Sequence, residues 1–249
     1  MQIQQRIQAF VQLGLFIQVH FLESSTDKDL EWFEKWEKVK KEAYTYNNWF
    51  IPKFVQESIM NIAEMLNEKE LNQFASVFKT DKNPKTVAII CAGNIPMVAF
   101  HDIMMTLLSG NKALVKTSSD DPILIPFLFR LLIEIEPQFK DFISFADGKL
   151  EKFDAVIATG SNNTSSHFEY YFSKYPNIIR KNRSSVAVLN GDESDEELKA
   201  LGKDVFSYFG LGCRNVSQLL VPENYNFDKF FEAIFDFGFL IENKKYGNN

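Results

Sequence analysis

The sequence predicts an α/β fold, built on an open, mostly parallel β-sheet that follows a helical N-terminal region. Three observations support this prediction. Residues 1–85 carry apolar side chains at three- and four-residue steps, which is typical of amphipathic helices. Beyond Pro84, short apolar runs alternate with helical patterns, as they do in parallel sheets with crossover helices. Several of these runs end in turns, and turns at the carboxyl ends of strands are where open α/β sheets bind ligands.

Helices are expected at four places in the N-terminal region: 2–21, 30–43, 54–66 and 68–78. Gly14 is a weak point of the first helix, because glycine has a low helix propensity. Residues 24–27 are expected to cap the second helix, and the polar turn at 80–85 ends the region. No catalytic pattern occurs here, and we assign the aromatic side chains of this region to its core.

Apolar runs beyond Pro84 predict five strands: 86–91, 112–116, 142–145, 154–161 and 184–189. Helices are expected at about 97–109, 122–136 and 164–174, with right-handed crossovers between parallel strands. The loops AGNIP, KTSSDDP and ATGSNN each follow a strand. They are therefore expected to converge on one crevice, although no GxGxxG fingerprint is present.

The C-terminal part contains a candidate nucleophile. A capped helix is expected at 192–208, a strand at 218–222, and a further helix at 227–237 with Gly238 just past its end. Between the first helix and the strand, YFGLGCRNV places Cys213 in a turn flanked by Gly210 and Gly212. These glycines lack a Cβ, so the backbone can bring the thiol close to a substrate.

The chemistry of a thiolate suits it to carrying an acyl group. A thiolate is a strong nucleophile and a good leaving group, so it can be acylated, hold the acyl group covalently and release it without a metal. The alternative for Cys213 is a buried, inert cysteine, which is the usual environment of a lone cysteine. The choice between the two interpretations depends on the other motifs that accompany Cys213 in the sequence.

Composition excludes several classes of function. The 249 residues carry a net charge of −6, so no nucleic-acid partner is expected. The two cysteines, Cys91 and Cys213, form no metal-binding pattern with the three histidines, and no metal is expected. No secretion signal begins the chain and no apolar run is long enough to span a bilayer. The cytoplasm is therefore the expected location.

Four stretches, CAGNIPMVAF, LLSGNKALVKTSSDDP, DAVIATGSNN and YFGLGCRNVSQLLVP, occur in the order and approximate spacing seen in the aldehyde dehydrogenase superfamily. Within it, the chain most resembles acyl-CoA reductases related to the fatty acid reductase of bacterial luminescence, through GNIP followed by His101 and Asp102, RKNRSSVAVL, and GLGCRN. The resemblance covers about residue 47 to the end. It implies an aldehyde dehydrogenase-like fold. It also implies reduction of a long-chain fatty acyl-CoA, or another acyl thioester, to the aldehyde.

Members of this family use a nicotinamide cofactor and an acylated cysteine, and they have a longer C-terminal part. The chain is therefore expected to be C-terminally truncated. With the resemblance added, it divides into a helical region at 1–85, a nucleotide-binding α/β domain at 86–190, and a partial catalytic domain at 191–249 that carries Cys213.

Carried over by position, the resemblance implies that Cys213 is the nucleophile. It implies that the side-chain amide of Asn94 forms the oxyanion hole with the backbone N–H of Cys213, since neutral donors stabilise the charge of a tetrahedral intermediate. Gly160 and Ser161 match the turn where the cofactor pyrophosphate meets a helix N-terminus. Taken alone, Asn94 is equally well explained as a turn residue before Pro96.

The resemblance also bears on the choice of cofactor. Lys116 matches a lysine that contacts the adenosine ribose, and Ser119 stands where many NAD-specific relatives have a glutamate. A carboxylate there would repel a 2′-phosphate, whereas Ser119 with Lys116 and Thr117 can accept it. NADPH is therefore expected rather than NADH, with CoA as the leaving group of the substrate. The alternative is a solvated loop.

Other polar residues near these motifs are considered for roles in catalysis and phosphate binding. Hydrolytic aldehyde dehydrogenases carry a general-base glutamate before the strand that matches SSVAVL, but no carboxylate lies between Ile178 and Ser185. This absence favours reduction over oxidation to an acid. The basic residues in this stretch are candidates for phosphate contacts or a solvated turn: Arg180, Lys181 and Arg183. His101 and His167 are candidate proton donors or structural residues, with His101 the better placed.

Two other functions stay open at this point. A CoA-acylating or hydrolytic aldehyde dehydrogenase would share the cysteine and the asparagine. An inactive fragment that binds a nucleotide or a partner would share the fold. We also expect a homo-oligomer, and an acyl-donor enzyme as a possible partner.

Overall fold

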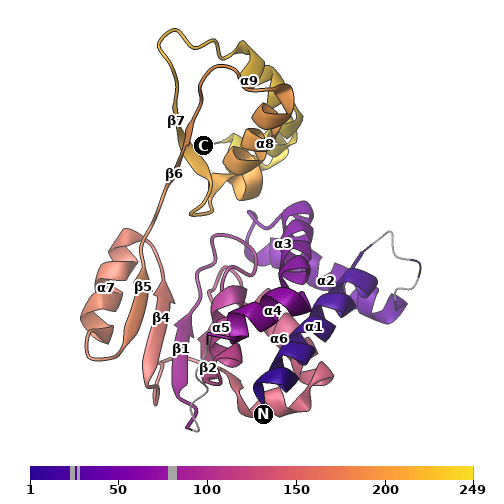
Figure 1. Cartoon of the computed structure of the whole chain (residues 1–249), viewed down its shortest axis with the longest axis vertical. Helices are drawn as coiled ribbons and strands as arrows, with labels where there is room; N and C mark the ends of the chain where they lie inside the picture. The colour runs from indigo at the N-terminus through magenta and orange to yellow at the C-terminus, as the bar shows by residue number, and fades with distance from the viewer. Residues whose placement is uncertain (23–25, 27–28, 78–82, 249) are drawn as a thin grey trace. The chain divides into compact units, whose positions relative to one another are not determined.

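The computed structural model describes residues 1–22, 26, 29–77 and 83–248, and these form two compact units. The first unit comprises Met1–Asn47 and Ile51–Lys181, and the second comprises Asn48–Phe50 and Asn182–Asn249. Figure 1 shows the elements of both units. The three-part division at residues 85 and 190 stays a prediction.

The first unit is built on a five-stranded, fully parallel sheet, which confirms the predicted fold class. Its strands are β1 (Thr86–Ile90), β2 (Lys112–Lys116), β3 (Ile143–Phe145), β4 (Ala155–Thr159) and β5 (Asn177–Arg180), in the order β3-β2-β1-β4-β5. The chain builds outward from β1 through β2 to β3, then returns to place β4 on the other side of β1. The order therefore reverses between β1 and β4, and ligands of open α/β sheets bind at such a reversal.

Helices lie against both faces of this sheet (Figure 1). The helical elements between the strands are α5 (Phe100–Leu108), α6 (Leu124–Ile135), the short 3-10 helix η1 (Pro137–Asp141) and α7 (Asn162–Phe172). Under α7, Ala88 and Val156 pack with Phe168 and Phe172. On the other face, α5 contacts β1 and β2. The predicted helices are confirmed, with ends shifted by a few residues, as is usual at helix termini.

The N-terminal helices pack together and onto α5 and α6. They are α1 (Ile3–His20), α2 (Leu30–Tyr46), α3 (Pro52–Met65) and α4 (Glu68–Ala75). Gly14 does not interrupt α1. A Cβ at this position would lie 2.8 Å from the Cβ of Leu66, so the glycine permits close packing of α1 on the end of α3.

Aromatic side chains form much of the core of these helices, as the sequence predicted. The rings of Phe21 and Trp36 stack with centroids 5.1 Å apart, and Phe127 of α6 lies 5.9 Å from each of them. The predicted cap at 24–27 falls mostly on residues outside the described ranges. Asp29 caps α2, because its side chain accepts from the backbone N–H groups of Glu31 and Trp32.

The second unit contains a parallel two-stranded sheet of β6 (Ser185–Val188) and β7 (Val216–Leu220). The expectation that 184–189 extends the nucleotide-binding sheet is therefore wrong. A β-branched run predicts a strand but not its partner, and β5 was missing from the prediction. β5 was overlooked because it is a four-residue edge strand in which Ile178 is half exposed.

The helical elements of the second unit are α8 (Asp195–Phe206), η2 (Ser207–Gly210), α9 (Asp228–Ala233), η3 (Phe235–Glu242) and α10 (Lys244–Gly247). A reciprocal capping box between Ser194 and Glu197 starts α8, as its acidic first turn predicted. The expected helix at 227–237 is wrong in its second half. The chain changes there to the 3-10 helix η3, and Gly238 lies inside it rather than past its end.

No helix in the described part of the chain combines the length and the apolar character needed to cross a membrane.

Candidate active site

Asn94 and the predicted cofactor residues lie at one edge of the sheet in the first unit. They occupy the loops after β1, β2 and β4, and these strands are parallel neighbours. The first two loops are in close contact, because a Cβ at Gly93 would overlap with the side chain of Ser118. The side chain of Asn94 is exposed at this edge.

The loop after β2 carries the residues expected near the adenosine ribose. Lys116 is the last residue of β2, and its Nζ donates to the carbonyl of Gly148 at 3.0 Å. Ser119 is exposed in the turn that follows, and Thr117 is half-buried. An ammonium group has three donors, so Lys116 keeps donor capacity beyond the contact with Gly148.

The loop after β4 leads directly into α7. Ser161 is the N-cap, and its Oγ accepts from the backbone N–H of Thr164 at 3.2 Å. A Cβ at Gly160 would lie 3.0 Å from the Cβ of Thr164 and 3.2 Å from the ring of Phe168, so this close packing favours glycine. Because capping engages the hydroxyl of Ser161, the first-turn backbone N–H groups of α7 are what this segment offers to an anion.

An ion pair that the sequence did not predict joins α5 to the end of β5. Nη1 of Arg180 lies 2.5 Å from Oδ2 of Asp102. Lys181 pairs with Glu169 at 2.8 Å, so two of the three basic residues considered for phosphate contacts have carboxylate partners. His101 is exposed in the first turn of α5.

The sequence also did not predict a role for Ser165. Its hydroxyl is fully buried and lies 3.3 Å from the carbonyl oxygen of Gly160 and 3.2 Å from that of Arg180. It therefore links the loop after β4 to the end of β5. A serine in a polar helix such as α7 gives no signal of this role in the sequence.

Two buried titratable groups adjoin the Asn94 loop: Cys91 precedes it in the chain, and Asp121 accepts a hydrogen bond from Met97 at its end. Burial raises the pKa of the Asp121 carboxyl to about 6, although its hydrogen bonds from Met97 and Leu124 act in the opposite direction. Burial, with smaller effects from Asp121 and Asp102, raises the pKa of the Cys91 thiol to about 12. Cys91 is therefore a protonated, buried thiol at neutral pH, unsuited to nucleophilic attack.

Cys213 lies in the second unit and is exposed, so the burial expected of an inert cysteine is not found at this position. Its turn connects η2 to β7. Asn215 organises this turn: its Oδ1 accepts from the N–H of Gly212 at 2.8 Å, and its Nδ2 donates to the carbonyls of Asp204 and Ser207 at 2.9 and 3.0 Å. The ability of asparagine to bond main-chain groups in turns was the signal available in the sequence.

The backbone before Cys213 is left-handed at three consecutive residues. The φ angles of Tyr208, Phe209 and Gly210 are 53°, 57° and 72°. Such values are unfavourable for aromatic residues, and they persist where the surroundings fix them. The ring of Phe209 is buried, with centroids 5.1 Å from Trp49 and 5.2 Å from Tyr246.

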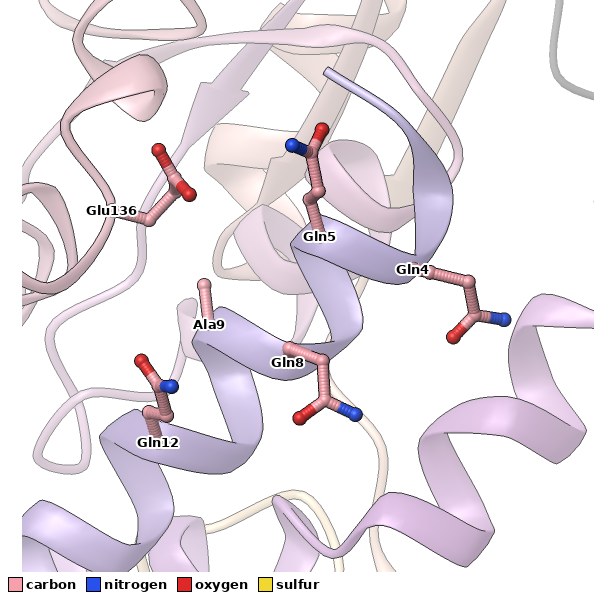
Figure 2. Close-up of a pocket in the computed structure, with 6 residues that line it drawn as sticks. All are labelled: Gln4, Gln5, Gln8, Ala9, Gln12 and Glu136. Carbon is pink, nitrogen blue, oxygen red and sulfur yellow. The ribbon is translucent and has the colours of Figure 1, made fainter.

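A shallow groove of about 280 Å³ lies elsewhere in the first unit, along α1. Figure 2 shows the side chains that line it: Gln4, Gln5, Gln8, Ala9, Gln12 and Glu136. It contains none of the predicted site residues. Within the described ranges, no group of three or more histidine, cysteine or acidic side chains is arranged to hold a metal ion.

Comparison with solved structures shows the fold. Aldehyde dehydrogenase 21 from Physcomitrella patens matches with a TM-score of 0.70 and 14% identity over 94% of this chain and 51% of its own. HpcC from Thermus thermophilus matches with a TM-score of 0.68 and 17% identity over 97% and 48%. The aldehyde dehydrogenase KauB from Pseudomonas aeruginosa matches with a TM-score of 0.64 and 14% identity over 95% and 50%. The chain thus spans about half the length of these structures.

Comparison with known sequences shows the family. No curated protein matches the chain. The family model described as acyl-CoA reductase (LuxC) matches residues 26–234 of the 249, a range that includes Cys213, Asn94 and the predicted cofactor residues. Together with the aldehyde dehydrogenase-like fold, this match shows that the chain belongs to the LuxC family of acyl-CoA reductases.

Proposed function

We propose that the protein takes part in the NADPH-dependent reduction of a long-chain fatty acyl-CoA to the aldehyde, with Cys213 as the acylated nucleophile. The observation that carries the proposal is an exposed thiol in a turn fixed by Asn215, in a chain that belongs to the acyl-CoA reductase family. The other cysteine is buried and protonated. It therefore offers no competing nucleophile.

The proposed reaction begins with attack of the Cys213 thiolate on the carbonyl carbon of the thioester. A new carbon–sulfur bond forms, the bond to the CoA sulfur breaks, and CoA leaves as a thiolate that takes up a proton. The amide of Asn94 donates to the oxyanion of the tetrahedral intermediate, and one such donor is worth about 3–4 kcal/mol of barrier lowering.

The loops of the first unit fit a dinucleotide phosphate. The reversal of strand order lies between β1 and β4, where open α/β sheets bind their ligands. Lys116, Thr117 and Ser119 would hold the ribose and its 2′-phosphate, while Gly160, Ser161 and the start of α7 would hold the pyrophosphate. When bound, NADPH supplies the hydride that reduces the acyl carbon.

Release of the aldehyde restores the nucleophile. The carbon–sulfur bond of the Cys213 thiohemiacetal breaks, the oxygen becomes the aldehyde carbonyl, and the thiolate is regenerated. Acyl-CoA, NADPH and a proton thus give aldehyde, CoA and NADP⁺. The stretch from Ile178 to Ser185 contains no carboxylate to activate water, which supports reduction over hydrolysis of the acyl-enzyme. A cytoplasmic homo-oligomer that receives acyl groups from a donor enzyme belongs to the same proposal.

Intact-mass measurement after incubation with a long-chain acyl-CoA tests the nucleophile. We expect one acyl adduct on the wild-type protein and on Cys91→Ser, and none on Cys213→Ser. The two variants form a matched pair, because each removes one of only two thiols. An adduct that survives Cys213→Ser would rule out this nucleophile.

The fate of the acyl group separates the remaining functions. Adding NADPH should release the fatty aldehyde. Release of the free acid would instead indicate a hydrolytic enzyme, and net formation of acyl-CoA from aldehyde, CoA and NADP⁺ would indicate a CoA-acylating one. Nucleotide binding without any adduct would indicate an inactive nucleotide-binding protein.

A further inference from the structure

Two buried side chains hold carbonyl groups of the Asn94 loop, one just before Asn94 and one two residues after it. The Nδ2 of Asn47, just past the end of α2, donates to the carbonyl of Gly93 at 3.0 Å. The Oγ of Ser58, in α3, donates to the carbonyl of Pro96 at 2.8 Å. The side chains of Asn47 and Ser58 come from the N-terminal helices and lie in the core. The peptide group just before Asn94 and the one that follows Pro96 are therefore both anchored from outside the loop.

A third contact holds the end of the loop. The backbone N–H of Met97 donates to Oδ2 of Asp121 at 2.9 Å, while the other carboxylate oxygen accepts from the N–H of Leu124 at the start of α6. Met97 is buried with a φ of 56°, in the left-handed region that is unfavourable for its side chain. Such a conformation persists where the surroundings enforce it, and Asp121 is the group in position to do so.

The loop is fixed while the side chain it presents stays accessible. Asn94 is exposed, whereas Gly93, Pro96 and Met97 are buried. Close contact of Gly93 with Ser118 adds a steric limit on the same loop. A donor that must point at a developing oxyanion benefits from this arrangement, because the energetic advantage of such a donor depends on its being oriented before the reaction.

We propose that Asn47, Ser58 and Asp121 are positioning residues that hold the Asn94 loop so that its amide is preorganised for the oxyanion. This inference rests on the proposed function, because it assigns the three residues an effect that passes through Asn94. A misplacement of about 1 Å at a catalytic group can lower a rate by about 100-fold, so loss of one anchor is expected to have a smaller, measurable effect.

Ser58 offers the cleanest test, because a hydroxyl can be removed and restored. We expect Ser58→Ala to lower the maximal rate of Cys213 acylation about 10-fold and to change the half-saturating acyl-CoA concentration less than about twofold. Ser58→Thr keeps the hydroxyl and should recover most of the rate. Asn94→Ala should lower the rate about 100-fold or more. Acylation is followed by intact mass and needs no cofactor.

The double variant distinguishes a positioning role from a merely structural one. If Ser58 acts through Asn94, adding Ser58→Ala to Asn94→Ala should slow acylation no further. A residue that only stabilises the fold would lower the rate by the same factor in both backgrounds. Ser109→Ala is the control, because it removes a partly buried hydroxyl that, like that of Ser58, donates to a backbone carbonyl, here that of Thr106 in α5 at 2.9 Å. It should leave the rate unchanged.

The results separate this inference from the proposed function. An equal loss in both backgrounds, or a Ser58→Ala protein as fast as wild type, would overturn the positioning role while the reaction itself stands. A wild-type protein that forms no adduct, or an Asn94→Ala protein that reacts at the wild-type rate, would overturn the proposed function and this inference with it. Thermal unfolding of each variant shows that the rates refer to folded protein.

Discussion

The cysteines and Asp121 show that burial gives residues of one type different chemical properties. Cys91 and Cys213 are both free cysteines, yet one is a buried, protonated thiol and the other is exposed in a turn. Asp121 keeps two backbone hydrogen bonds in a site that disfavours its charge. The chemistry available at each position thus follows from solvation as well as from residue type.

The raised pKa of Asp121 predicts a pH dependence of stability. Its pKa in the folded protein is about 6, against 3.8 as the ordinary value. The stabilisation of the folded protein by protonation of Asp121 is therefore fully present below about pH 4. It is lost as the pH rises through 6, which lowers the free energy of unfolding by about 3 kcal/mol in all. Asp121→Asn should remove this loss, so the free energy of unfolding should fall less between pH 5 and pH 8 than in wild type.

Urea denaturation across this pH range measures the effect. Asp147→Asn is the control, because it removes one negative charge from an exposed position. The amide of Asp121→Asn has one acceptor oxygen, so the variant would lose one of the two backbone hydrogen bonds and be less stable at every pH. For this reason only the change in the free energy of unfolding with pH is compared, not its absolute value. Parallel pH profiles for wild type and Asp121→Asn would contradict the prediction.

Ser119 provides a test of cofactor choice. Ser119→Glu places a carboxylate beside the proposed 2′-phosphate site, and like charges within a few ångströms repel. We expect the dissociation constant for NADPH to rise about 10-fold or more, with a much smaller change for NADH. Fluorescence titration of the nicotinamide measures both constants without turnover. Ser119→Ala controls for loss of the hydroxyl, and an unchanged ratio in Ser119→Glu would refute the assignment.

At the scale of elements, the turn that carries Cys213 depends on Asn215. Asn215→Ala removes hydrogen bonds to Gly212, Asp204 and Ser207, and we expect it to lower the free energy of unfolding by about 1–3 kcal/mol. Acylation of Cys213 should also slow. Asn226→Ala is the control, because the side chain of Asn226 accepts from one backbone N–H, that of Asp228. Equal effects of the two substitutions in urea denaturation would show that Asn215 does not organise the turn.

Local pattern predicted most elements, because burial on both faces of a parallel strand leaves a continuous apolar run such as that of β1. Pairing was harder to predict. β6 has the β-branched sequence of an internal strand, yet it pairs with β7 and not with the five-stranded sheet. The local sequence of a strand does not determine which strand it pairs with. In the candidate site, too, local features could be predicted from the sequence and tertiary contacts could not. Asn94 and Cys213 lie in recognisable loops, whereas Asp121 and Ser58 act through contacts with distant backbone groups that no short motif encodes.

At the scale of the whole molecule, the second unit buries one side of its sheet and leaves apolar side chains exposed. Its core is formed by Leu189, Leu198, Leu201, Phe230 and Ala233. In β6, Val186 is 49% exposed and Val188 is 77% exposed, and Phe235 in η3 is 83% exposed. Parallel strands are usually covered on both faces. Exposed apolar side chains can favour association or dye binding where they form a patch.

This exposure predicts that polar substitutions change surface behaviour without a loss of stability. Val188→Thr combined with Phe235→Ser should reduce the fluorescence of an apolar dye and the tendency to aggregate, while the free energy of unfolding changes by less than about 0.5 kcal/mol. Leu198→Ala is the contrasting control: its side chain is buried, so it should lower the free energy of unfolding by about 2–5 kcal/mol. Dye titration, light scattering and urea denaturation measure the three quantities. If the double variant binds the dye as wild type does, the exposed side chains of β6 and η3 are not the surface that the dye recognises.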